Sequence, residues 1–92
     1  MPKSAAAETA PQEKDAWSVW VDENPLRAWR RETKRPILQT AAQIKASMTS
    51  IQLWERGVHK PGEDHMAAIA TLIGDEGIDA RWDEWKSRQP TQ

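Results

Sequence analysis

The segment Ser47–Gly57 constrains the fold of this chain more than any other, and its sequence is Ser-Met-Thr-Ser-Ile-Gln-Leu-Trp-Glu-Arg-Gly. Ser47 is a suitable N-cap, because its hydroxyl can accept from backbone N–H groups two or three residues later. Ile51 and Trp54 lie three residues apart and therefore share one helical face. Gly57 stands where a left-handed residue ends a helix with little strain. The segment therefore predicts a short helix that buries two apolar side chains and turns small polar ones outward.

Patterns on both sides of this segment predict further helices. Asn24 is a suitable N-cap, and Pro25 stands at a first helical position, where proline is favoured. Apolar side chains recur at helical spacing in the later segments as well. Five helices are predicted, at residues 25–34, 37–45, 48–56, 63–73 and 79–88. No strand-like alternation and no internal repeat is found, so the predicted fold class is all-α.

The two ends of the chain differ from this helical region. Residues 1–14 consist mainly of Ala, Pro, Glu, Lys and Thr, and such a segment cannot offset the entropy lost on ordering. Trp17, Trp20 and Val21 have the spacing of one helical face. They form either a short helix or an arm that packs its tryptophans on the domain. We assign residues 1–16 to a disordered N-terminal tail, 17–88 to the domain and 89–92 to a C-terminal tail.

Length and composition limit the size of the core and the cellular setting. A chain of 92 residues makes one small domain, near the size where a single core is modest and dimerisation often helps. The absence of cysteine excludes disulfides and thiolate metal sites and fits a reducing cytoplasm. No apolar run approaches the roughly 18 residues of a membrane span, and the N-terminus has no apolar signal core. We expect a soluble cytoplasmic protein.

Charge is divided unevenly along the chain, whose net charge is −1. Residues 1–24 hold two basic and five acidic side chains, a balance of −3. Residues 25–62 hold eight basic and two acidic side chains, giving +6, and residues 63–92 hold three basic and seven acidic, giving −4. The positive charge coincides with the segment Ser47–Gly57, and the local field matters more than the total for attracting phosphate. The alternative is a charged, solvated surface with chance clustering.

Several residues of the central region recur at the spacing of a known family. They are Leu26-Arg-Ala-Trp-Arg30, Ala41, Ile44, Ile51, Trp54-Glu55-Arg56-Gly57, Lys60-Pro61 and Ile69-Ala70-x-Leu72. With them, residues 25–74, just over half of the chain, resemble the phage-repressor-like helix-turn-helix domain, the Xre (Cro-type) class of bacterial and phage regulators. The resemblance implies a five-helix lambda-repressor-like fold. It also implies an ion pair, since members usually pair a Glu at the Glu55 position with an Arg in the first helix, here Arg30.

The chain departs from the family pattern at three places. The turn between the two central helices usually carries Gly but has Lys45 here, so the turn either differs slightly or tolerates a left-handed lysine. Many relatives have Gln near the start of the second helix, where an ungapped match gives Ile37. Gln39 serves in its place only if the register slips. Thr40 falls where a core Leu is common.

The resemblance implies which side chains contact DNA, because the second helix of such a motif enters the major groove. The expected base contacts are Met48, Thr49 and Leu53, with Ser50 and Gln52 beside them. The expected phosphate contacts are Arg35, Gln39, Lys45, Ser47, Arg56, His59 and Lys60, which position the protein without specifying sequence. Hydroxyl, methyl and amide groups at the base-facing positions favour A/T-containing steps. The alternatives are that Met48 and Leu53 pack against a neighbouring helix or a dimer partner and that Gln52 is only solvated.

The sequence gives little indication of a metal site, an enzyme active site or a base-stacking surface. His59 and His65 lie near acidic residues, but their spacing does not put two ligands on one helical face, so we expect no metal. No paired nucleophile and base and no Gly-rich phosphate loop occurs, so we expect neither an enzyme nor a cofactor. Four of the six tryptophans form pairs at i, i+3, which favours packing in a core or interface over base stacking.

These observations predict a sequence-specific, double-stranded DNA-binding transcriptional regulator, expected to be a repressor of phage or mobile-element type associated with the nucleoid. A module of this size gains affinity as a homodimer on a two-fold operator. The Trp-rich flanks, Trp17, Trp20, Trp82 and Trp85, are the candidate dimer or partner surfaces. One alternative is an antitoxin, or another protein-interaction module, that uses this fold and these flanks to bind a protein. Another is a phage inhibitor that binds a host protein.

Overall fold

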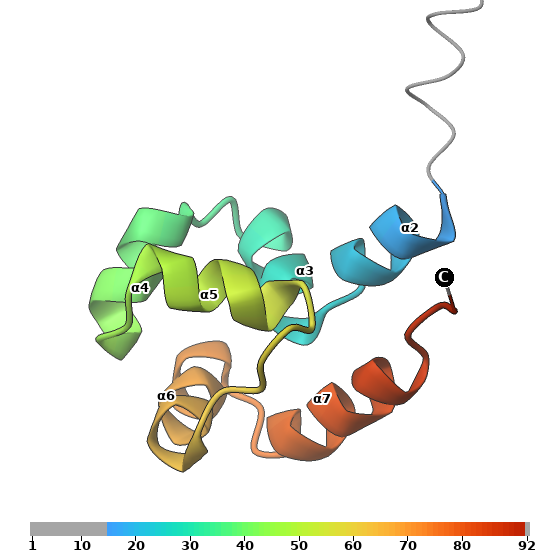
Figure 1. The fold of residues 1–92 in the computed structure, drawn as a ribbon. Helices are drawn as coiled ribbons and strands as arrows, with labels where there is room; N and C mark the ends of the chain where they lie inside the picture. The colour runs from blue at the N-terminus through green and yellow to red at the C-terminus, as the bar shows by residue number, and fades with distance from the viewer. Residues whose placement is uncertain (1–14, 92) are drawn as a thin grey trace, which may run out of the picture.

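The computed structural model describes residues 15–91, and every regular element in that part of the chain is an α-helix. The helices are α2 (Ala16–Asp22), α3 (Pro25–Glu32), α4 (Ile37–Ile44), α5 (Met48–Glu55), α6 (Glu63–Ile73) and α7 (Ile78–Ser87). Figure 1 shows α4 and α5 side by side at one end of the molecule and α2 and α7 at the other end. The predicted all-α class is confirmed.

Residues 15–91 contain one helix more than the five predicted, because Trp17, Trp20 and Val21 belong to the helix α2 and not to an extended arm. The Asp15 carboxylate caps this helix by accepting from the backbone N–H of Ser18 at 2.8 Å. Of the tail predicted for residues 1–16, residues 1–14 lie outside the described part of the chain. Asp15 and Ala16 are the cap and the first residue of α2.

Four helices end at a residue with left-handed backbone conformation. These residues are Lys34, Lys45, Gly57 and Gly74, with φ between 55° and 78°. In each case the next backbone N–H donates to the carbonyl five residues earlier, at 2.7 to 3.0 Å. This closure explains why α3 ends at Glu32 and α4 at Ile44, one or two residues before their predicted ends. The turn after α4 therefore keeps the left-handed geometry with lysine in place of glycine.

The hydrophobic core draws on all six helices. Its buried apolar residues are Trp20, Leu26, Ala41, Ile44, Ile51, Trp54, Met66, Ile69, Ile78, Trp82 and Trp85. Thr40, which stands where a core leucine is common in the family that the chain resembles, is also fully buried. Its hydroxyl donates to the Pro36 carbonyl at 3.1 Å, so the polar group is satisfied without leaving the helix. Of the tryptophans with i, i+3 spacing, Trp20, Trp82 and Trp85 are thus core residues, and Trp17 is partly buried against them.

Two tryptophans join the first described helix to the last. The rings of Trp20 and Trp85 stack with centroids 4.1 Å apart and planes 2° from parallel. Each indole N–H donates to the other residue's backbone carbonyl at 2.6 Å. Gly57, at the end of α5, packs against this pair, and a Cβ atom there would lie 2.5 Å from Trp20 Cη2. The stacked tryptophans therefore also fix the position of the end of α5.

Candidate functional site

Helix α5 follows α4 after a connection of three residues, Lys45 to Ser47. Ser47 caps α5 as predicted, and its hydroxyl oxygen accepts from the backbone N–H of Ser50 at 3.0 Å. The same hydroxyl donates to Ser50 Oγ at 2.9 Å. The Ser47 hydroxyl therefore both accepts and donates a hydrogen bond within the helix cap. A role for this side chain in holding a phosphate, as expected from the sequence, would compete with the cap.

Helix α5 has one buried and one exposed face. Ile51, Trp54 and Glu55 are buried against the rest of the domain. Of the five expected base contacts, Met48, Thr49 and Gln52 are exposed, whereas Ser50 and Leu53 are partly buried. Met48 is 41% exposed, so within residues 15–91 no neighbouring helix covers it. The exposed residues form a mixed surface of hydroxyl, amide and thioether groups.

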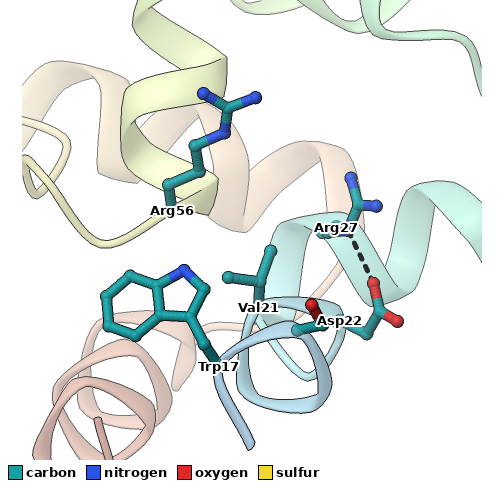
Figure 2. A pocket seen from close by; sticks show the side chains of 6 residues that line it. Trp17, Val21, Asp22, Arg27 and Arg56 are labelled. Atoms are coloured by element: carbon teal, nitrogen blue, oxygen red, sulfur yellow. Dashed lines mark hydrogen bonds and ion pairs between the residues drawn. The ribbon is translucent and has the colours of Figure 1, made fainter. Parts of the chain in front are cut away.

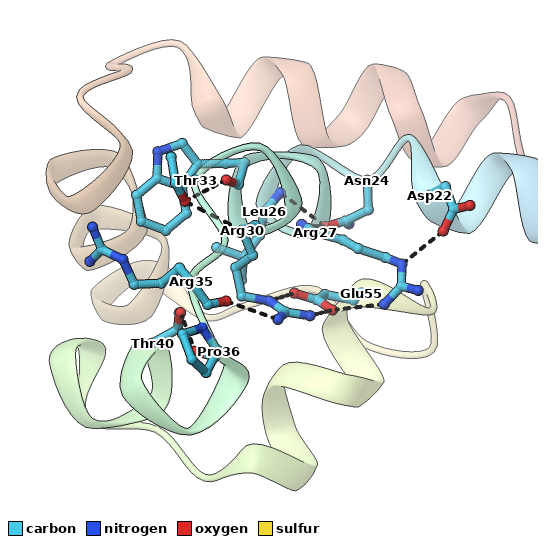
Figure 3. A network of polar contacts seen from close by, with 11 residues as sticks. Asp22, Asn24, Leu26, Arg27, Arg30, Thr33, Arg35, Pro36, Thr40 and Glu55 are labelled. Carbon is cyan, nitrogen blue, oxygen red and sulfur yellow. Dashed lines mark hydrogen bonds and ion pairs between the residues drawn. The ribbon is translucent and has the colours of Figure 1, made fainter.

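An ion pair between Arg30 and Glu55 holds α5 against α3. Arg30 Nε donates to Glu55 Oε2 and Arg30 Nη2 donates to Glu55 Oε1, both at 2.8 Å (Figure 3). Glu55 is only 3% exposed, so the carboxylate depends on this two-point contact. The hydrogen bonds that Arg30 donates to Glu55 raise the pKa of Arg30, although burial opposes this effect. Arg27 approaches the same carboxylate, with Nη1 3.8 Å from Oε1. The ion pair implied by the family resemblance is present.

The expected phosphate contacts are spread over several elements. Gln39 lies on α4, Lys45 in the connection before α5 and His59 in the loop after it, and all three side chains are exposed. Arg35 Nη1 donates to Gln43 Oε1 at 2.8 Å, and its guanidinium carbon lies 4.9 Å from the Trp29 ring centroid. Arg56, the C-cap of α5, is exposed.

Lys60, another expected phosphate contact, is bound to helix α7. Its ammonium donates to Asp79 Oδ1 at 2.6 Å and to Asp83 Oδ1 at 2.7 Å, on consecutive turns of α7. These hydrogen bonds raise the pKa of Lys60, and the one accepted by Asp79 has the larger effect. The lysine therefore joins the loop after α5 to the acidic helix, and it would have to leave two carboxylates to hold a phosphate.

The expectation that four tryptophans form a partner surface is wrong for three of them. Trp20, Trp82 and Trp85 are 3%, 1% and 1% exposed. They pack on one another and on the end of α5, because α2 and α7 lie against the core and do not extend from it as flanks. Trp17 alone of the four remains partly exposed.

Beside Trp17 lies a pocket that the sequence did not predict. It has a volume of about 350 Å³ and is lined by Trp17, Ser18, Val21, Asp22, Arg27 and Arg56 (Figure 2). Its residues come from α2, α3 and the C-cap of α5, so it exists only because α2 packs against the other two helices. Arg56 was expected to face phosphate. Arg27 belongs to the basic segment, but no pattern in the sequence linked either arginine to Trp17.

The histidines have no metal-site geometry. His65 lies against Trp54, with ring centroids 5.0 Å apart, and its Nε2 is 3.3 Å from the Lys45 carbonyl oxygen. Within residues 15–91, no three His, Cys, Asp or Glu side chains are grouped closely enough to hold a metal ion. In the same part of the chain, no helix has both the length and the apolar character needed to cross a bilayer.

No match was found when the chain was compared with models of known protein families, with characterised proteins and with solved structures. The function of the chain is therefore inferred from the geometry of its own residues.

Proposed function

We propose that this chain is a sequence-specific regulator that binds double-stranded DNA through a phage-repressor-like helix-turn-helix, with α4 and α5 as the two helices of the motif. The observation that carries the proposal is the two-sided character of α5. Its buried face and the Arg30–Glu55 pair fix it to the domain, while Met48, Thr49 and Gln52 remain exposed. In motifs of this kind the second helix enters the major groove with its N-terminal residues against the base edges.

The connection between α4 and α5 supports this assignment. Lys45 has φ 57° and ψ 47°, and this single left-handed residue reverses the chain in three residues. Ser47 then caps α5, so the motif is closed at both ends by backbone and hydroxyl hydrogen bonds. Such a tight turn holds the second helix at a fixed angle to the first, which presentation in a groove requires.

The exposed groups of α5 favour particular bases. The Thr49 hydroxyl can donate or accept, and its methyl group and the Met48 side chain can contact thymine methyls. Gln52 can form a paired contact with adenine. Leu53 adds apolar contact at the edge of the face, whereas the Ser50 hydroxyl already accepts from Ser47. Because α5 carries no lysine or arginine between residues 48 and 55, we propose a preference for A/T-containing steps.

The distribution of charge supports the same face. The eight basic residues of segment 25–62 lie on α3 and on the segments around α4 and α5, whereas seven acidic residues of segment 63–92 lie on or beside α6 and α7. We propose a homodimer in the cytoplasm, at the nucleoid, on two half-sites about one helical turn apart. Bound at a promoter, it would act as a repressor. No exposed tryptophan cluster is left to favour a protein partner over DNA.

Selection of bound sequences from random duplex DNA tests the proposal. The unaltered chain should enrich a motif of two related half-sites. Thr49→Ala should change or weaken that motif, because it removes a base-facing hydroxyl and methyl group. Thr71→Ala is the matched control, since Thr71 is exposed on α6, away from the proposed face. Absence of any enriched motif would overturn sequence-specific binding, and equal motifs for both variants would overturn the role of α5.

A further inference from the structure

The pocket beside Trp17 continues toward the exposed face of α5. A second pocket, of about 300 Å³, shares Val21, Arg27 and Arg56 with the first. It also reaches Gln52, one of the exposed residues of α5. The two pockets therefore form one groove that runs from α2 to the face proposed to enter the major groove.

Two hydrogen-bond donors of this groove have no acceptor within residues 15–91. The Trp17 indole N–H makes no hydrogen bond there, and Figure 2 shows its nitrogen on the side of the ring toward Arg56. The Arg56 guanidinium makes no hydrogen bond or ion pair in the same range, and the side chain is exposed. A neutral N–H and a guanidinium at one pocket match a ligand that offers oxygen acceptors and negative charge.

The charges around the groove are unbalanced in favour of an anion. Asp22 is shared by two arginines, with Arg27 Nε at 3.0 Å and Arg31 Nη1 at 2.9 Å. Glu55 is bound by Arg30, as described above. The groove is lined by two carboxylates, Asp22 and Glu55, and by three arginines, Arg27, Arg30 and Arg56, which leaves an excess of one positive charge. The carboxylate that lines the pocket is already compensated, so it does not exclude an anionic ligand.

We propose that this pocket binds a backbone phosphate of the DNA duplex, so that α2 extends the DNA-contacting surface beyond the two helices of the motif. The inference rests on the function proposed above. A phosphate next to the major groove is the anion that the groove can reach when α5 is seated, because the two surfaces are continuous. Arg56 supplies charge, the Trp17 N–H supplies a neutral hydrogen bond, and Val21 with the indole ring contacts the adjoining sugar. Such contacts fix register without reading sequence.

Affinity for the selected duplex, measured over a range of salt concentrations, tests this site. Arg56→Gln should weaken binding and lower the slope of log affinity against log salt by about one, because one fewer counterion is released. Trp17→Phe keeps the ring but removes the N–H, so it should weaken binding roughly tenfold with an unchanged slope. Arg81→Gln is the control of equal charge change, since Arg81 pairs with Asp75 on the acidic side of the molecule. Circular dichroism melting establishes that each variant is folded.

The NMR signal of the Trp17 indole gives a direct test of the proposed contact. The indole N–H resonance of Trp17, identified by its loss in Trp17→Phe, should move to higher chemical shift when the duplex is added. If the unaltered chain binds a selected motif but Arg56→Gln and Trp17→Phe behave like Arg81→Gln and the resonance stays in place, the pocket does not hold phosphate, although the proposed function stands. If the unaltered chain binds no duplex at all, both proposals fail.

Discussion

Gly57 has a left-handed backbone and a tryptophan ring where a side chain would begin, with Trp20 Cη2 2.5 Å from an ideal Cβ position. Gly57→Ala should therefore destabilise the fold by about 2–4 kcal/mol, combining the strain of left-handed alanine with overpacking. Gly74 has the same φ of +78° and nothing within 4 Å of its Cβ position. Gly74→Ala should cost only about 1 kcal/mol. Urea denaturation measures both, and equal losses would show that contact with Trp20 is unimportant.

The Arg30–Glu55 pair makes a second prediction at the scale of single residues. Arg30→Met should destabilise the fold by about 3–5 kcal/mol, because it leaves the Glu55 carboxylate buried without its main partner. Arg30→Met combined with Glu55→Met should recover most of this loss, since no buried charge remains. The free energies of unfolding of Arg30→Met, Glu55→Met and the double variant give the coupling energy between the two side chains. Losses that simply add would contradict a stabilising role for the pair.

At the scale of elements, the proposed function makes the acidic face of α7 a competitor with DNA for the loop after α5. Asp79→Asn with Asp83→Asn releases Lys60 and should raise affinity for duplex DNA several-fold at low salt, with a steeper salt dependence. The control pair, Glu76→Gln with Glu84→Gln, removes the same charge from residues not bonded to Lys60. A fluorescence-anisotropy titration compares them. The same gain for both pairs would indicate a general charge effect and no competition at Lys60.

The cap of α2 gives this helix a pH dependence. The hydrogen bond from the Ser18 backbone N–H lowers the pKa of Asp15. A carboxylate with a lowered pKa contributes stability above its unfolded value, about 3.9, and loses it as pH falls through the lower folded value. Asp15→Ser keeps a capping oxygen that does not titrate in this range. Between pH 5 and pH 2 the melting temperature of the unaltered chain should fall more than that of Asp15→Ser. Parallel curves would exclude Asp15 as a contributor.

Local patterns predicted much of the fold, because capping and helical spacing depend on residues close together in the sequence. The Ser47 cap, the left-handed Gly57 and the buried face of α5 belong to this group. The Arg30–Glu55 ion pair joins residues far apart in the sequence, and it was predicted from the family resemblance and not from a local pattern. The pocket could not be predicted, since periodicity shows that Trp17 lies on a helical face but not which helix it meets.

Two further differences arise from packing between distant segments. The spacing of Trp82 and Trp85 indicated packing but did not distinguish a core from an interface, and the contact with α2 decided it. The count of charges by segment treated the Lys60 ammonium as available to phosphate, although it is bound to two carboxylates of α7. Asp79 and Asp83 lie four residues apart and therefore on one helical face, a signal that α7 offered a site for a cation.

At the scale of the whole molecule, we propose that one face, made by α5 and the groove beside it, contacts DNA while the acidic face of α7 remains in solvent. The most direct measurement is a titration of the ¹⁵N-labelled chain with the selected duplex, followed by backbone amide and indole resonances. The largest changes are expected at residues 48–53, Arg56 and the Trp17 indole, with little change at residues 79–84. Changes concentrated at residues 63–87, with residues 48–53 unaffected, would contradict it.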